Sequence, residues 1–119
     1  MGFDAEMKWP ETPPLSAAAA VRERARVVGD GHEMLLTVGV IDNRKNVVNA
    51  LRALQLLPPR YRLVLAGGNG YGSEAVHGFI ASEGLEDRVK VLGYVAPETL
   101  ARLYQSASAL LFPSLDVVF

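Results

Sequence analysis

The chain has 119 residues, enough for one domain with a buried core but not for two. Half of the residues are hydrophobic and 21% are charged, a composition typical of a globular protein and not of a disordered one. The net charge of −1 gives no strong field for nucleic acid or an anionic membrane, and the absence of cysteine excludes disulfides and thiolate metal sites.

No apolar run is long enough to span a bilayer, and the first ten residues lack the apolar core of a signal peptide. We therefore expect a cytoplasmic protein without a transmembrane segment. The last residues, 109–119, are apolar and stop without a polar tail, so we also expect the chain to be a fragment. His32 and His77 have no partner at ligand spacing, and we predict no metal site.

The first 31 residues precede the regular pattern. Residues 1–15 contain three prolines and are predicted to form an extended lead-in. Residues 16–31 are predicted to form a helix and a turn, in which Ser16 caps the helix and Gly29 stops it. Arg22, Glu23, Arg24 and Arg26 are expected to face outward as a solvated surface.

From residue 32 onward, short apolar runs alternate with apolar residues at helical spacing. Strands are predicted over residues 34–40, 62–66, 88–92 and 109–112, and helices over residues 47–57, 76–83 and 97–107. This alternation predicts an α/β fold with a Rossmann-like parallel sheet of about four strands and flanking helices. Residues 32–119 are accordingly predicted to form one partial Rossmann-like domain.

In an open parallel sheet, ligands bind outside the carboxyl ends of the strands, which here are four loops. In the first loop, Arg44 and Lys45 lie near the start of a predicted helix, where backbone N–H groups and the helix dipole favour an anion. The two cations could hold a phosphate or diphosphate there, or they could be a solvated pair. Residues 67–72 form a glycine-rich loop that could approach a ligand closely, or a simple turn, since the spacing is not that of a dinucleotide or P-loop motif.

Several segments together resemble the C-terminal domain of group 1 (family 4) glycosyltransferases, which are retaining enzymes of the GT-B fold. The resemblance covers about residues 33–115. In chain order, the segments are Leu36-Thr37-Val38-Gly39, Arg44-Lys45-Asn46, Leu63-Val64-Leu65-Ala66-Gly67, Arg88-Val89-Lys90-Val91-Leu92-Gly93-Tyr94-Val95, Leu103-Tyr104, Ala107 and Phe112-Pro113-Ser114-Leu115.

The resemblance implies that residues 32–119 are part of a nucleotide-sugar-binding domain and contribute the donor site of a glycosyltransferase. It implies that Arg44 and Lys45, after Gly39, grip the donor diphosphate, stabilising charge as the glycosidic bond breaks without a strict need for metal. It further implies that Gly67 and Gly68 flank the donor pocket. The segment Gly93-Tyr94-Val95 would lie by the nucleotide base. No metal or cofactor is expected besides the nucleotide-diphosphate sugar, which is a substrate.

The chain departs from the family after Leu115. The family continues with an aromatic residue and Glu-Gly-Phe-Gly, opening an E-x7-E motif that contacts the donor, whereas Val117 stands here at the place of the first Glu. Asp116 is one residue out of register. We therefore predict no catalytic residue in this chain and expect it to be inactive alone, needing an acceptor-binding domain or subunit.

Two other functions remain open from the sequence. The chain could be a non-catalytic α/β interaction module that associates with another subunit or with itself through an exposed sheet edge. It could also belong to another Rossmann-like enzyme class, such as a nucleotide-sugar epimerase, although the acidic or histidine constellation such enzymes need is not found.

Overall fold

The computed structural model describes residues 14–42 and 45–111 of the 119. The elements run α2 (Ala17–Val28), β1 (Glu33–Val38), α3 (Lys45–Gln55), β2 (Tyr61–Ala66), α4 (Ser73–Ser82), β3 (Val89–Gly93), α5 (Pro97–Ser106) and β4 (Ala109–Leu110). The strands form one parallel sheet in the order β3-β2-β1-β4. The predicted α/β, Rossmann-like fold with about four parallel strands is therefore confirmed.

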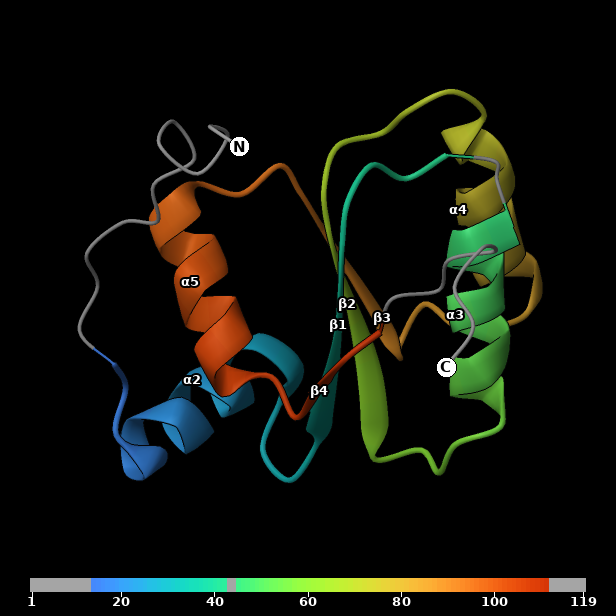
Figure 1. Cartoon of the computed structure of the whole chain (residues 1–119). Helices are drawn as coiled ribbons and strands as arrows, with labels where there is room; N and C mark the ends of the chain where they lie inside the picture. The colour runs from blue at the N-terminus through green and yellow to red at the C-terminus, as the bar shows by residue number, and fades with distance from the viewer. Residues whose placement is uncertain (1–13, 43–44, 112–119) are drawn as a thin grey trace, which may run out of the picture.

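Helices cover both faces of the sheet, with α3 and α4 on one side and α2 and α5 on the other (Figure 1). The two faces hold separate apolar clusters because side chains alternate along each strand. Toward α3 and α4 the buried cluster includes Leu35, Leu51, Leu54, Leu63 and Leu65, and toward α2 and α5 it includes Val28, Met34, Leu36, Val64 and Leu103. The central strands β1 and β2 are thus buried on both faces, as their unbroken apolar runs predict.

Local sequence signals set the helix ends. Ser16 Oγ accepts a hydrogen bond from the Ala19 amide at 3.1 Å, and the Gly29 amide donates to the Ala25 carbonyl at 2.8 Å. Pro97 occupies the first turn of α5, where its missing N–H costs nothing. The helix and turn predicted over residues 16–31 are present in the structure. The predicted lead-in, residues 1–15, lies outside the described residues apart from Pro14 and Leu15.

Three details differ from the sequence prediction. The first strand ends at Val38 and not at residue 40, because Gly39 turns the backbone with φ +140° and Val40 leaves the sheet, 57% exposed. The last strand is described only over Ala109–Leu110. The third is the outward basic surface predicted on α2. There, Arg24 is half-buried and its Nη1 donates to the Ser106 carbonyl of α5 at 3.0 Å.

Candidate functional site

The loops after β1, β2 and β3 meet at the carboxyl edge of the sheet, the upper end of the molecule in Figure 1. Backbone hydrogen bonds join them in sequence across the edge. The Gly39 amide donates to the Ala66 carbonyl at 3.0 Å, and the Gly67 amide donates to the Gly93 carbonyl at 2.8 Å. The structure therefore brings together Gly39, Gly67 and Gly93, which the sequence places far apart.

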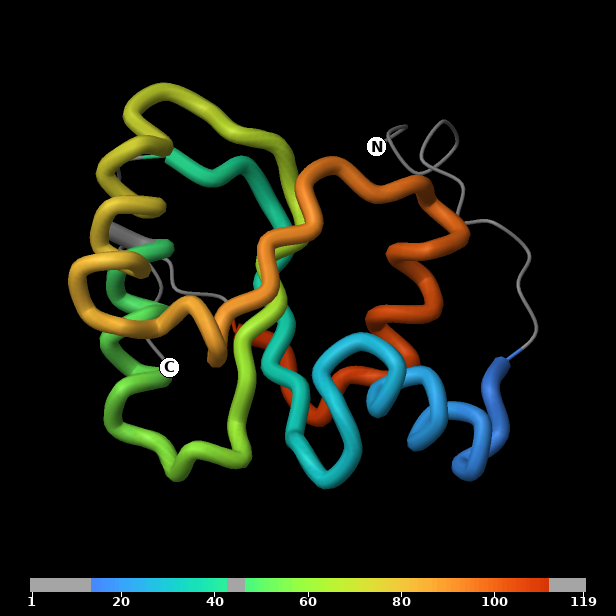
Figure 2. The backbone as a smooth tube through the Cα atoms, turned by 180° about the vertical axis from the view of Figure 1, so that it is seen from behind, coloured from blue at the N-terminus to red at the C-terminus, as the bar shows by residue number. Residues whose placement is uncertain are grey.

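A second set of bonds joins the loop after β1 to residues 67–72, which we call the glycine loop. The Ile41 amide donates to the Gly68 carbonyl at 2.9 Å, and the Gly70 amide donates to the Ile41 carbonyl at 2.5 Å. Ile41 and Asn69 form an isolated parallel bridge between these bonds. The parallel pairing of β1 and β2 thus continues past the end of both strands, and Figure 2 shows the two loops running together from behind.

The glycines of this edge differ in the space around them. A Cβ on Gly67 would overlap the Gly39 carbonyl oxygen, so glycine at this position is required by the contact between the two loops. A Cβ at Gly39, Gly68 or Gly93 would meet no atom of residues 14–42 and 45–111 within 4 Å. Open space above these three positions leaves their backbone accessible to another molecule.

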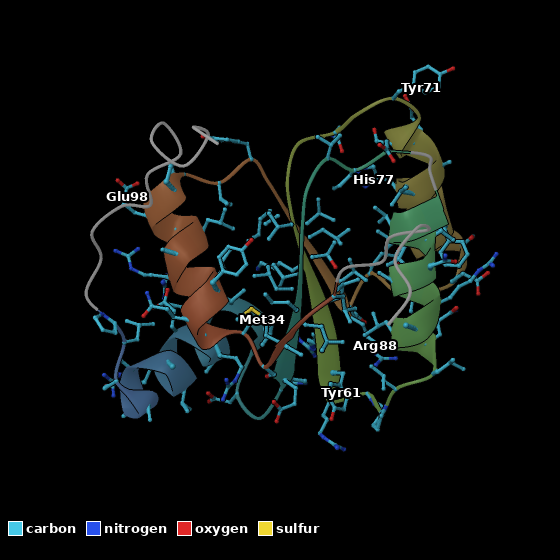
Figure 3. The ribbon with its side chains drawn as sticks, in the orientation of Figure 1. Met34, Tyr61, Tyr71, His77, Arg88 and Glu98 are labelled. Atoms are coloured by element: carbon cyan, nitrogen blue, oxygen red, sulfur yellow. The ribbon has the colours of Figure 1, made fainter. Side chains whose placement is uncertain are left out.

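Exposed apolar side chains surround the same edge. Tyr94 is 80% exposed and Val40 is 57% exposed, while Tyr71, at the far tip of the glycine loop, is 87% exposed (Figure 3). Val95 differs from its neighbour Tyr94, because it packs on the apolar cluster toward α2 and α5. Of the predicted segment 93–95, the structure therefore leaves Gly93 and Tyr94 open and turns Val95 inward.

The predicted cations are only partly placed. Arg44 lies outside the described residues, and Lys45 is the first residue of α3, whose side chain is likewise not described. The start of α3 lies at the carboxyl edge (Figure 1). Asp42, 9% exposed, lies in the same loop after Ile41 and is not one of the predicted site residues. An acidic residue just before a helix complements the helix dipole, and this position in the sequence is the signal that could have identified Asp42.

One side-chain contact at this edge has no signature in the sequence. His77 of α4 lies with its Nε2 at 2.9 Å from Asn69 Oδ1 of the glycine loop, although the sequence suggested no partner for this histidine. The two residues are eight positions apart, across a turn and the start of a helix, so no spacing rule relates them.

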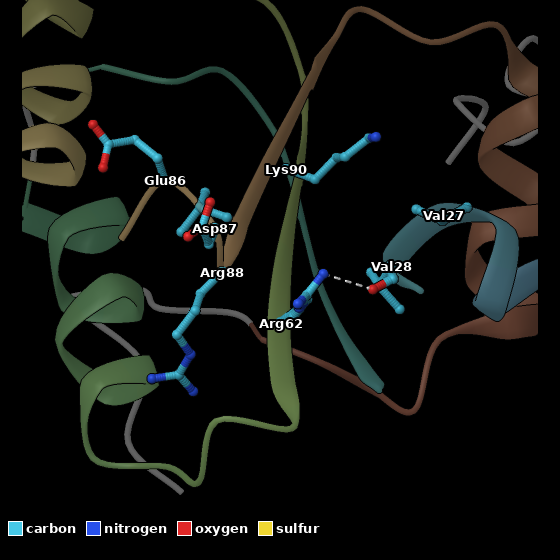
Figure 4. A pocket seen from close by; sticks show the side chains of 8 residues that line it. Val27, Val28, Arg62, Glu86, Asp87, Arg88 and Lys90 are labelled. Carbon is cyan, nitrogen blue, oxygen red and sulfur yellow. Dashed lines mark hydrogen bonds between the residues drawn. The ribbon is translucent and has the colours of Figure 1, made fainter. Parts of the chain in front are cut away.

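The opposite edge of the sheet carries a small pocket of a different kind. It has a volume of about 120 Å³ and its lining includes Arg62 and Lys90, together with Glu86 and Asp87 (Figure 4). Arg62 Nη1 donates to the Val28 carbonyl at 3.0 Å. This pocket lies at the amino ends of β2 and β3, and its lining contains none of the described predicted site residues.

Over residues 14–42 and 45–111, no three His, Asp or Glu side chains gather as a metal ion would require. In the same ranges, no helix has the length and apolar character needed to cross a membrane.

Residues 22–116 match the family described as glycosyl transferases group 1. The O-antigen chain mannosyltransferase B of Escherichia coli is 35% identical over 83 residues, 66% of this chain and 22% of that protein. An uncharacterized glycosyltransferase of Methanocaldococcus jannaschii is 28% identical over 114 residues, 94% of this chain and 27% of that protein. The chain therefore spans about a quarter of the length of the curated relatives it matches.

Solved structures of HepE from Anabaena share the fold. The complex with UDP superimposes with a TM-score of 0.65 at 21% identity, over 82% of this chain and 27% of that chain. The complex with UDP and glucose has a TM-score of 0.64 at the same identity and coverage. The complex with UDP-glucose has a TM-score of 0.62 at 19% identity.

Proposed function

The chain belongs to the group 1 glycosyltransferases, and from that membership we propose that it supplies the nucleotide-sugar donor site of such an enzyme. The site would be the carboxyl edge of the sheet. The observation that carries the proposal is that Gly39, Gly68 and Gly93 lie on neighbouring loops of this edge, each with open space where a side chain would otherwise be.

The proposed site suits a diphosphate for simple electrostatic reasons. The start of α3 lies at this edge, and the first N–H groups of a helix are unsatisfied and favour an anion. Arg44 and Lys45 would add two positive charges beside it, and a guanidinium can hold two phosphate oxygens at once. As the bond to the sugar breaks, the same groups would stabilise the negative charge that develops on the leaving diphosphate.

The base would lie near Gly93 and Tyr94 in this proposal. Tyr94 offers an exposed aromatic ring on the loop after β3, next to a glycine with open space around it. Anabaena HepE, which has the same fold, is described with UDP and with UDP-glucose, and the similar E. coli protein is named a mannosyltransferase. These relatives support a nucleoside-diphosphate hexose as the class of donor.

We further propose that transfer of the sugar needs an acceptor-binding domain or subunit besides the residues of this chain. The chain spans only 22% and 27% of its two curated relatives, so most of each relative's residues have no counterpart in it. The chain by itself would then bind the donor without transferring or hydrolysing it at an appreciable rate.

Calorimetric titration with UDP, GDP, UDP-glucose and a GDP-hexose tests donor binding directly. Gly68→Ala adds a methyl group where a ligand would approach, at a Cβ position that meets no atom of the described residues, and at a φ outside the left-handed region. We expect this change to weaken binding about tenfold or more, since a ligand in van der Waals contact with the backbone must be displaced. Lys45→Ala should weaken binding as well, because it removes a charge from the diphosphate site.

Gly78→Ala is the matched control. Gly78 also has no atom within 4 Å of its Cβ position, but it lies within α4. Alanine there should favour the helix and leave donor affinity unchanged. Equal nucleotide affinities in the wild type and in Gly68→Ala would refute the proposed site, and the absence of any nucleotide binding would refute the function.

The alternative is an interaction module that associates through a sheet edge. It draws on two exposed apolar side chains of the edge strands, Val91 of β3 at 40% and Leu110 of β4 at 37%. Donor binding and association are separable experimentally, because the former concerns the carboxyl ends of the strands and the latter concerns the edges of the sheet.

A further inference from the structure

We propose that His77 is a positioning residue, which holds the glycine loop in its donor-facing conformation through a hydrogen bond to Asn69. Its effect on donor affinity rests on the proposed function. Its effect on the loop does not, and can be measured without any ligand.

The first step is that His77 is attached to a fixed element. It lies on α4 between Val76, which is fully buried, and Ile80, which is 6% exposed, and both belong to the cluster against the sheet. His77 itself is half-buried and lies toward the carboxyl edge, at the same end of the molecule as Tyr71 (Figure 3). A group on the first two turns of a packed helix moves little relative to the sheet.

The second step is that Asn69 is the residue through which the two loops are joined. Its backbone forms the bridge with Ile41, and the residues on either side of it exchange hydrogen bonds with Ile41. With Oδ1 as the acceptor at 2.9 Å, the His77 ring donates from Nε2. The bond therefore fixes Asn69 from the helix side, while Ile41, 1% exposed, fixes it from the sheet side.

The third step is the composition of the loop. Four of its six residues are glycine, at positions 67, 68, 70 and 72. Glycine loses more conformational freedom on ordering than any other residue, so such a loop is held only by its specific contacts. Asn69 is the loop residue whose side chain makes a hydrogen bond to α4, and Gly68, with its open face, is its immediate neighbour. Loss of the bond would spread the positions of Gly68 over several conformations.

The experiment combines His77→Ala, Asn69→Ala, the double variant and His77→Gln. Amide hydrogen exchange measured by NMR reports on the loop, with the Ile41 and Gly70 amides as probes, and UDP titration reports on the site. We expect each alanine variant to exchange these two amides about three- to tenfold faster and to bind UDP about three- to tenfold more weakly, as the loss of one hydrogen bond predicts. The double variant should be no weaker than either single variant.

Glutamine at position 77 has an amide N–H₂ that can reach Asn69, so His77→Gln should restore much of both properties. Gly78→Ala, one residue along α4, should change neither. The proposal is overturned if exchange at Ile41 and Gly70 is unchanged in both single variants, or if their effects on the two amides simply add. Where the wild type binds no UDP, the proposed function fails, and the exchange result still decides whether His77 holds the loop.

Discussion

Arg88 illustrates how a charged residue of this sequence acts through backbone groups and not through ligands. Its guanidinium donates to the carbonyls of Leu57 at 3.2 Å, Pro58 at 2.8 Å and Tyr61 at 3.0 Å. These carbonyls follow α3 and start β2, so Arg88 ties the beginning of β3 to the preceding connection. It lies at the amino edge, toward the bottom of Figure 3, opposite the proposed donor site.

Arg88→Met should lower the free energy of unfolding by about 2–3 kcal/mol, because the carbonyls of Leu57, Pro58 and Tyr61 lose a charged donor and the bonds to Leu57 and Tyr61 are partly buried. UDP affinity should not change, since the opposite edge is intact. Urea denaturation measures the free energy of unfolding, and calorimetric titration measures the UDP affinity. Arg60→Met is the control: Arg60 lies 4.9 Å above the centre of the Tyr61 ring, is exposed and should contribute less than about 1 kcal/mol. Similar losses in the two variants would contradict this role of Arg88.

Thr37 of β1 is 8% exposed, and its buried hydroxyl has no hydrogen-bond partner among residues 14–42 and 45–111. An unsatisfied buried hydroxyl costs free energy that an isosteric methyl group does not. Thr37→Val should therefore raise the free energy of unfolding by about 1 kcal/mol, as a higher urea midpoint at unchanged slope. A lower midpoint would mean that the hydroxyl makes a stabilising contact after all.

At the scale of elements, α2 is held to the rest of the domain by a polar contact from its middle turn as well as by its apolar face. Arg24 reaches the Ser106 carbonyl at the end of α5, where the last carbonyls of a helix carry partial negative charge and lack helical partners. Leu15, just before α2, donates its amide to Gln105 Oε1 at 2.5 Å. Helices α2 and α5 therefore act as one layer over the sheet.

Arg24→Ala should lower the free energy of unfolding by about 1.5–3 kcal/mol, the usual value for a hydrogen bond to a charged donor. Arg22→Ala removes the same side chain from an exposed position of the same helix, and its effect should stay within about 0.5 kcal/mol. Thermal or urea denaturation distinguishes the two. Equal effects would show that the charge, and not the contact with α5, is what matters.

At the scale of the whole molecule, the sheet has two edges of unequal character. The β3 edge includes exposed Lys90, and a charged side chain on an edge strand discourages pairing with another chain. The β4 edge carries exposed Leu110, and within residues 14–42 and 45–111 only β1 pairs with β4. If the chain associates with itself, the β4 edge is therefore the expected place.

Leu110→Lys should then reduce self-association measured by sedimentation equilibrium over a range of concentrations, because a charge on the edge opposes pairing. Leu56→Lys is the matched control, since Leu56 is 87% exposed after the end of α3 and far from the edge in sequence. A wild type that stays monomeric at all concentrations, or equal effects of the two variants, would speak against association through β4.

The sequence by itself predicted the fold class, the order of strands and helices along the chain, and the family. Buried parallel strands must be apolar on both faces and helices on one, so the pattern of residues such as Leu35, Leu36, Leu51 and Leu54 reports the architecture directly. It also predicted which loops lie at the carboxyl edge. All strands of a parallel sheet run in the same direction, so the loop after each strand lies at the same end of the sheet.

The tertiary structure alone decided which residues in those loops meet and which remain open. Gly67 and Gly68 are neighbouring glycines in the sequence. The Gly39 carbonyl oxygen occupies the place of a Cβ on Gly67, whereas the Cβ position of Gly68 faces open space. The sequence predicted the same exposed position for Arg22 and Arg24, yet of the two only Arg24 bonds to the Ser106 carbonyl. It also gave no indication that His77 bonds to Asn69. These differences arise from contacts between segments distant in the chain, which depend on the packing of whole elements and leave no periodic trace in the sequence.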